Sequence, residues 1–197
     1  MPDRIATFSA NGETFYGVVA DGGVIALSPD FPQWPTLREV IEAGALKQLV
    51  EAAKGRAITH ADGDFQWEIP VPAPEKIICV GVNFPDRNAE YKDGQDAPAN
   101  MSLFIRFPRS FTGHGRPLIR PEVSDKLDYE GEIAVVIGKG GRHIPDAEAL
   151  DHIAALTLCR RSVRWPLRAA PRARARRSST PSSRQGRALY FRAIFRA

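Results

Sequence analysis

Acidic residues are missing from the last quarter of this 197-residue chain, since none follows Asp151. Residues 160–197 hold 12 of the 27 basic residues, all of them arginine, and none of the 23 acidic ones, so this segment carries a net charge of +12 and residues 1–159 carry −8. A segment of Arg, Pro and Ser buries too little apolar surface to offset the entropy of ordering it. The composition therefore predicts a disordered basic tail over 160–197.

Cysteine and long apolar runs are also scarce. Cys79 and Cys159 are the only cysteines, which excludes a disulfide scaffold and suits a reducing compartment. No segment approaches the roughly 20 apolar residues of a membrane span, and residues 1–11 lack the apolar core of a signal peptide. These features predict a cytoplasmic protein without a membrane partner.

The first 70 residues predict a small unit of strands followed by a helix. Three segments alternate in the manner of short strands: 4–9, 13–20 and 24–28. The pairs Asn11-Gly12 and Asp21-Gly22 between them tolerate the positive φ angles of tight hairpin turns. We therefore expect a three-stranded antiparallel meander at the N-terminus.

A helix is expected after this meander. Thr36 and Glu39 have the spacing of a capping box, and an apolar period of helical spacing follows them to about residue 50, weakened at Gly44. Prolines at positions 70, 72 and 74 then favour an extended linker. The chain thus divides into a first domain over 1–70, a second over 71–159 and the tail over 160–197.

The sequence of the second domain predicts mostly β-strands. Strands are expected at 77–82, 102–107, 117–120, 127–139 and 156–159, with a helix over 146–155. Together with the N-terminal unit, this pattern predicts the α+β class.

The segment 127–139 contains the candidate metal-binding carboxylates. Because strand side chains alternate, Asp128, Glu130 and Glu132 share one face, and the odd positions form an apolar face. Two carboxylates about 5 Å apart repel by roughly 3 kcal/mol at an effective dielectric near 20, which water, protonation or a cation must relieve. A hard cation such as Mg²⁺ suits oxygen ligands at this spacing. From spacing alone, a solvated acidic strand face remains the alternative.

Four segments in order resemble the fumarylacetoacetate hydrolase family: residues 78–84, 102–106, 113–117 and 127–139. The resemblance implies an incomplete mixed β-sandwich or barrel domain and an enzyme that hydrolyses a C–C bond, isomerises or decarboxylates a 2-oxo acid such as an acylpyruvate. It also implies that Glu130 and Glu132 bind Mg²⁺ or Mn²⁺ and that the intact protein is a homodimer. Cys79, in an apolar run, is expected to be a core residue.

Catalytic candidates follow from the same resemblance. Where many members have a His-x-x-Glu pair, this chain has Arg87 and Glu90. Arginine stays protonated at neutral pH, so Arg87 would orient substrate while Glu90 activates water. His114, which lies between two glycines, is the alternative base. Arg106 is the candidate for binding a substrate carboxylate, with Arg109 as a further possibility.

The resemblance weakens after Cys159. The family's third metal-binding carboxylate is expected about where Arg161 stands, and no acidic residue is there. We interpret the change to arginine-rich sequence as a frameshift or truncation that impairs the enzyme. Two alternatives remain: an acidic module whose basic tail binds nucleic acid or an anionic membrane, and a non-functional fragment with open sheet edges. Of these partners, we expect the 2-oxo acid and not nucleic acid.

Overall fold

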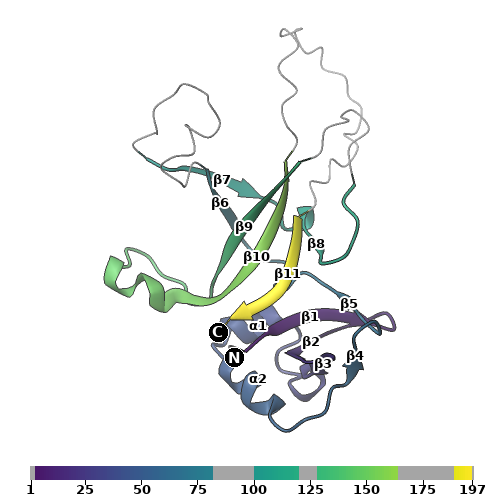
Figure 1. The fold of residues 1–197 in the computed structure, drawn as a ribbon. Coiled ribbons are helices and arrows are strands. Elements are labelled where there is room, and N and C mark those ends of the chain that lie inside the picture. Colours follow the sequence, from purple (N-terminus) through teal and green to yellow (C-terminus); the bar gives the residue numbers. More distant parts are fainter. Residues whose placement is uncertain (1–2, 82–99, 120–127, 164–188, 197) are drawn as a thin grey trace, which may run out of the picture.

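The structure, a computed structural model, describes residues 3–81, 100–119, 128–163 and 189–196, and for 128–130, 160–163 and 189–196 it describes the backbone only. An N-terminal unit of sheet and helices lies beneath a taller second unit made almost entirely of strands (Figure 1). No helix in the described ranges is long and apolar enough to cross a membrane.

A five-stranded antiparallel sheet forms the base of the N-terminal unit, in the order β4-β3-β2-β1-β5. Its strands are β1 (Ile5–Ala10), β2 (Glu13–Ala20), β3 (Gly23–Ala26), β4 (His60–Ala61) and β5 (Gln66–Trp67). Asn11 at φ 52°, Gly12 at φ 82° and Gly22 at φ 83° close the two hairpins. The predicted meander is confirmed, whereas β4 and β5 carry too short a pattern to be predicted.

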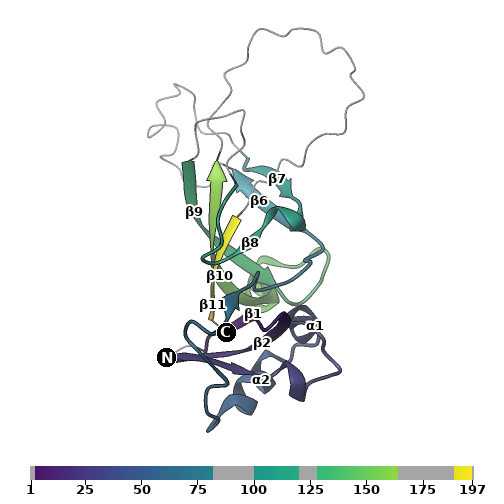
Figure 2. The ribbon, with the colours of Figure 1, turned by 90° about the vertical axis from the view of Figure 1, so that its right-hand side faces the viewer.

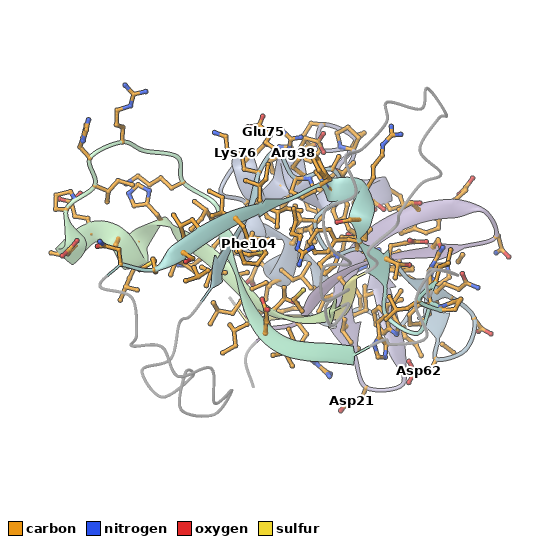
Figure 3. All side chains as sticks on the ribbon, turned by 90° about the horizontal axis from the view of Figure 1, so that it is seen from above. Asp21, Arg38, Asp62, Glu75, Lys76 and Phe104 are labelled. Atoms are coloured by element: carbon orange, nitrogen blue, oxygen red, sulfur yellow. The ribbon has the colours of Figure 1, made fainter. Side chains whose placement is uncertain are left out.

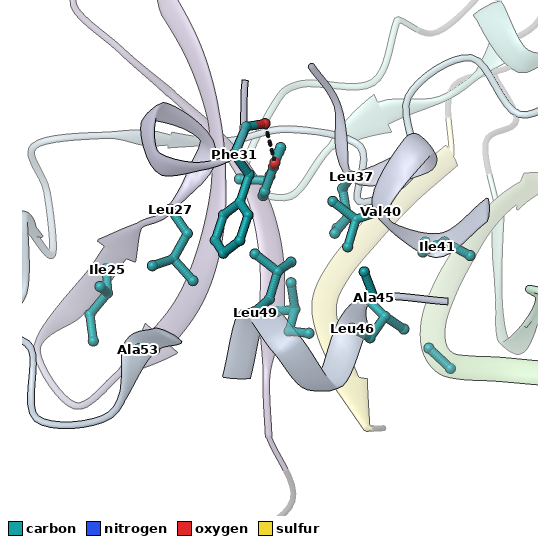
Figure 4. Packing of buried hydrophobic residues seen from close by; sticks show 13 residues of the cluster. Ile25, Leu27, Phe31, Leu37, Val40, Ile41, Ala45, Leu46, Leu49 and Ala53 are labelled. Atoms are coloured by element: carbon teal, nitrogen blue, oxygen red, sulfur yellow. Dashed lines mark hydrogen bonds between the residues drawn. The ribbon is translucent and has the colours of Figure 1, made fainter. Parts of the chain in front are cut away.

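Two short helices cover this sheet, α1 (Leu37–Glu42) and α2 (Leu46–Ala53), after a 3₁₀ turn η1 (Ser28–Asp30). Gly44, at φ +65°, separates them, so the single expected helix is two. Leu37, Val40 and Leu49 are fully buried in one cluster with Tyr16 of β2 and Ile25 of β3 (Figure 4). The Tyr16 hydroxyl donates to the Trp34 carbonyl at 2.7 Å, and burial, with Glu39 nearby, raises its pKa to about 12.

The predicted capping box is present at the start of α1. The Glu39 carboxylate accepts from the Thr36 backbone N–H at 2.7 Å and from the Thr36 hydroxyl, and these hydrogen bonds lower its pKa. A depressed carboxylate pKa adds stability above the unfolded-state value, and that stability is lost as the pH falls through the folded-state value.

We expect Glu39→Gln to lower the free energy of unfolding at pH 7 by about 1 kcal/mol, the usual magnitude for a cap. The difference from the unaltered chain should shrink as the pH falls through the acid range, because protonation removes the same charge. Urea unfolding followed by circular dichroism at pH 7 and at about pH 3 measures both effects. A difference that is equal at the two pH values would contradict the role of the charge.

Two further sheets build the second unit. β6 (Ile77–Gly81) pairs with β7 (Ser102–Arg106), and a four-stranded sheet has the order β8-β11-β10-β9. The strands of this sheet are β8 (Thr112–Gly113), β9 (Asp128–Ile137), β10 (Ile153–Val163) and β11 (Leu189–Arg196). β11 runs parallel to β8 and descends beside β1 (Figures 1 and 2).

Several predictions for this unit need correction. Residues 117–119 are not a strand, and the expected helix over 146–155 is a 3₁₀ helix, η3 (Asp146–His152), followed directly by β10. The geometry of the β9–β10 hairpin explains why the helical segment ends at His152. The Gly138 N–H donates to the His152 carbonyl at 2.9 Å, and His152 Nδ1 lies 2.7 Å from the Lys139 carbonyl. These contacts fix the end of η3 against β9, so β10 begins at Ile153.

Disorder over 160–197 is also the wrong expectation for part of that segment. β10 continues through residues 160–163, and residues 189–196 form β11. Backbone ladder bonds do not depend on side-chain type, so pairing with β9 extends past the change in composition at Cys159. Residues 164–188 lie outside the described part of the chain.

Candidate active site

β9 and β10 together present one sheltered face, which we call the inner face. Its described side chains are Glu132, Ala134 and Val136, which are half-buried, and Ala155, Thr157 and Cys159, which are buried. The register pairs Glu132 with Cys159, and residues directly opposite in an antiparallel ladder point to the same side. The acidic face of β9 is therefore the sheltered one.

The opposite face, which we call the outer ladder, is apolar and exposed. It consists of Ile133, Val135, Ile137, Leu156 and Leu158, which are between 41% and 71% exposed. Ile133 faces Leu158 and Val135 faces Leu156 across the strand pair. The predicted alternation of β9 is confirmed, with the apolar positions facing outward.

Glu130 and Glu132 occupy alternate positions of β9, which places them on the same face of the strand with Cα atoms roughly 7 Å apart. Glu132 is half-buried, with Ala134 as the next residue along the face. Among the side chains that the structure describes, no group of three His, Cys, Asp or Glu residues could hold a metal ion, and the Glu130 side chain lies outside that set.

Arg161 holds the register position directly across from Glu130. This is the place where the third carboxylate was expected. Arg160 faces Gly131 and therefore belongs to the other face. The strand pairing thus puts a cationic residue type beside the first of the two glutamates.

Arg106 lies near the end of β7, half-buried. Its guanidinium carbon is 5.2 Å from the centre of the Phe104 ring, and its Nε is buried without a hydrogen-bond partner. Phe104 was not singled out from the sequence, although its alternation with Arg106 in the strand is the signal that predicts a shared face. A planar guanidinium on an aromatic ring is preorganised for a carboxylate, and Arg109 is exposed on the following 3₁₀ turn η2 (Pro108–Ser110).

His114 is exposed on the loop after β8, and contacts with the N-terminal unit fix this loop. A Cβ added to Gly113 would lie 2.0 Å from the Trp67 carbonyl oxygen, so glycine is needed for that approach. Arg116 forms an ion pair with Glu68, which also accepts from the Ser9 hydroxyl at 2.7 Å. Local sequence gives no signal for this pair, because its two members are 48 positions apart.

The remaining catalytic candidates, Arg87 and Glu90, lie in residues 82–99, outside the described part of the chain. Their roles stay predictions. Cys79 is half-buried in β6 and belongs to neither cluster of buried hydrophobic residues in the described part of the chain, so the expected core position is not confirmed.

A cavity of about 300 Å³ lies at the far end of β9 from the glutamates. Apolar residues of α1, of the linker and of β9 line it, among them Ile41, Val71 and Val136. Its charged lining residues are Arg38, Glu42, Glu75 and Lys76. Figure 3 shows Arg38, Glu75 and Lys76 close to one another. Arg38 is held there by Glu42 at 2.7 Å and Glu75 at 3.2 Å.

The strand arrangement described above has close counterparts among solved structures. A fumarylacetoacetate hydrolase from Exiguobacterium antarcticum superposes with a TM-score of 0.64 at 28% identity, over 81% of this chain and 56% of that one. A maleylpyruvate hydrolase from Sphingobium sp. SYK-6, in complex with manganese(II) and pyruvate, gives 0.64 at 25% identity, over 81% and 58%.

Curated proteins are also similar to this chain in sequence. Oxaloacetate tautomerase YisK of Bacillus subtilis is 43% identical over 119 residues, which is 57% of this chain and 40% of that protein. The mitochondrial oxaloacetate tautomerase fahd2 of Xenopus laevis is 34% identical over 142 residues, 70% of this chain and 44% of that protein. The chain thus spans less than half the length of these relatives.

The family model described as fumarylacetoacetate (FAA) hydrolase C-terminal matches residues 76–182, more than half of the chain. The matched segment contains β6, β7 and the acidic strand β9, and it continues past Cys159 into the arginine-rich segment. Sequence, strand order and relatives point to one conclusion: the chain belongs to the fumarylacetoacetate hydrolase family.

Proposed function

We propose that this chain carries the metal-binding strand of a divalent-metal-dependent enzyme that acts on a 2-oxo acid. The observation that supports this best is the inner face of β9, where Glu130 and Glu132 occupy adjacent same-face positions and Glu132 is sheltered from solvent. Carboxylate oxygens are the donors that Mg²⁺ and Mn²⁺ prefer, so the residue types fit the ion. When bound, the ion would supply Lewis-acid polarisation of the substrate's oxo group.

The relatives narrow the reaction. The two curated relatives described above are named for oxaloacetate tautomerisation, and a structural neighbour is named for maleylpyruvate hydrolysis. Both substrates are 2-oxo acids. Keto–enol interconversion is the simpler chemistry, since it needs one proton to leave and one to arrive, and it is our first choice. Hydrolysis of an acylpyruvate C–C bond is the second.

The candidate residues of this chain would then have different roles in the reaction. Glu90 moves the proton or activates the water, Arg87 holds a substrate carboxylate, and Arg106 offers a second guanidinium at the end of β7. His114 is the alternative base, on a loop that the Glu68–Arg116 pair holds in place. The intact enzyme is a homodimer in the cytoplasm in this proposal, although the Xenopus laevis relative is named as mitochondrial.

The test follows the loss of the enol form of oxaloacetate by its ultraviolet absorbance. We expect the 197-residue chain to accelerate ketonisation only weakly with Mn²⁺ or Mg²⁺ present, because Arg161 stands where the third carboxylate was expected. Chelation or Glu132→Gln should remove that acceleration. Glu148→Gln, on exposed η3, is the matched control and should leave the rate unchanged. Acceleration that persists under chelation would contradict the proposal, and acceleration with an acylpyruvate alone would favour the hydrolase.

Arg161 is expected to weaken metal binding in this chain. A cationic residue at the register position across from Glu130 would repel a divalent ion, and arginine contributes no oxygen donor. We therefore expect Arg161→Asp to tighten Mn²⁺ binding by about tenfold, measured by the electron paramagnetic resonance signal of free Mn²⁺. Arg160→Asp makes the same change of charge at the position facing Gly131 and is the control. Equal tightening in both variants would indicate a general charge effect.

A further inference from the structure

Cys159 of β10 lies directly across the strand pair from Glu132 of β9. The two strands run side by side in both ribbon views (Figures 1 and 2). Residues directly opposite in an antiparallel ladder point to the same side of the sheet, with Cβ atoms about 4.5 to 5.5 Å apart. The thiol of Cys159 therefore belongs to the same sheltered face as the carboxylate of Glu132.

The surroundings of Cys159 differ from those of a cysteine that only fills a core. The residue is 9% exposed, yet neither cluster of buried hydrophobic residues in the described part of the chain includes it. The nearest positions on its face are Thr157 and Arg161 along β10 and Glu132 across the ladder. A core cysteine behaves as a small hydrophobe among apolar neighbours, and these neighbouring positions are polar or charged.

Ligand distances are compatible with one ion between Cys159 and Glu132. A thiolate binds Zn²⁺ at about 2.3 Å and a carboxylate oxygen at about 2.0 to 2.2 Å, so two side chains with Cβ atoms roughly 5 Å apart can share an ion. Glu130 holds the next position on this face of β9. The backbone thus places two glutamates and one cysteine along one short stretch of the ladder.

The charges at these positions also favour a thiolate ligand. Glu130, Glu132 and the arginine at position 161 leave one net negative charge, which is one too few for a divalent ion. A thiolate at Cys159 supplies the second, and its proton passes to solvent when the ion binds. Burial strengthens the attraction between the thiolate and the ion, because the local dielectric is lower than that of water.

We propose that Cys159 is the third ligand of the metal site, beside Glu130 and Glu132, and that its thiolate makes the site prefer Zn²⁺ or Co²⁺ to Mg²⁺. Thiolates select Zn²⁺ and similar ions, whereas sites built from carboxylates alone suit Mg²⁺ and Mn²⁺. This inference rests on the metal-binding role of β9 proposed above and deepens it, since it names a further donor and the ion that the donor favours.

The first experiment adds Co²⁺ to the reduced 197-residue chain and records the near-ultraviolet charge-transfer band of a cobalt–thiolate bond. We expect a band that saturates at one ion per chain and that Cys159→Ser abolishes. Cys79→Ser is the matched control and should keep the band, because Cys79 is the other cysteine and lies across from Phe104 in the β6–β7 sheet.

A missing band in the unaltered chain, or a band lost only in Cys79→Ser, would overturn the proposal. If Mn²⁺ still bound and still required Glu132, a missing band would remove the role of Cys159 alone and leave the proposed function intact. A chain that bound neither ion would contradict both.

The second experiment measures ion preference by titrating Zn²⁺ against bound Mn²⁺ and following the electron paramagnetic resonance signal of released Mn²⁺. We expect Cys159→Ser to weaken Zn²⁺ binding by at least ~100-fold, because a ligand is lost, and Mn²⁺ binding by no more than about threefold. Retained Mn²⁺ binding also shows that the variant is folded. Glu132→Gln should weaken both ions. Equal losses of both ions in Cys159→Ser would overturn the proposal and assign the residue a structural role in the ladder.

Discussion

Loss of either Glu130 or Glu132 is expected to weaken Mn²⁺ binding by at least ~100-fold. Both positions belong to the inner face of β9, and a hard divalent ion loses an anionic oxygen donor in each variant. Substituting a residue that merely supports a metal ligand costs 10- to 100-fold in affinity, so removing a ligand costs no less. Calorimetric titration of Mn²⁺ into Glu130→Ala and Glu132→Ala measures the loss.

Glu148→Ala is the matched control for these variants. It removes the same charge from an exposed position on η3, outside the β9–β10 ladder. Its Mn²⁺ affinity should equal that of the unaltered chain. Equal affinity in all three variants would show that the acidic strand is a solvated face, the alternative that its spacing alone leaves open.

Glu90→Gln is expected to lower kcat by roughly 10² to 10⁴, with a smaller effect on KM. An amide has the shape of the carboxylate but cannot accept a proton, which is the contribution of a general base. The acid limb of the pH profile of kcat should disappear with it, because that limb reports protonation of the base. Stopped-flow measurement of oxaloacetate ketonisation between pH 5 and 9 gives both quantities.

His114→Ala provides the comparison. The exposed loop position of His114 leads us to expect kcat within about threefold of the unaltered chain and an intact acid limb. The opposite pattern, with near-normal kcat in Glu90→Gln and a lost limb in His114→Ala, would assign the base to the loop after β8.

Local patterns predicted those parts of the fold that short-range physics determines. Asn11-Gly12 and Asp21-Gly22 tolerate the positive φ angles of tight turns, and the structure has positive φ at Asn11, Gly12 and Gly22. Glu39 reaches back to Thr36 within one helical turn, so three residues of spacing were enough to predict the contact. Gly44 was recognised as a weak point, and its left-handed φ completes the break between α1 and α2.

The parts of the fold that local patterns did not predict depend on pairing between strands that are distant in the sequence. β8 and β11 are parallel neighbours although 75 residues, 114–188, lie between them in the sequence. The local sequence at Thr112 and Gly113 does not predict a strand. The arginine-rich composition after Cys159 predicted disorder, yet β9 supplies a ladder for residues 160–163. The position of Arg161 across from Glu130 likewise follows from register, which sequence spacing cannot reveal.

The contact between Gly113 and the Trp67 carbonyl also provides an optical reporter. Trp67 makes an edge-on contact with Phe65 at 4.7 Å between ring centres, and the next residue, Glu68, binds Arg116. A ligand that moves the His114 loop is therefore expected to move the Trp67 backbone and, with it, the Trp67 side chain. Tryptophan emission from the N-terminal unit would then follow binding events in the second unit without an added dye, with Trp67→Phe as the silent reference.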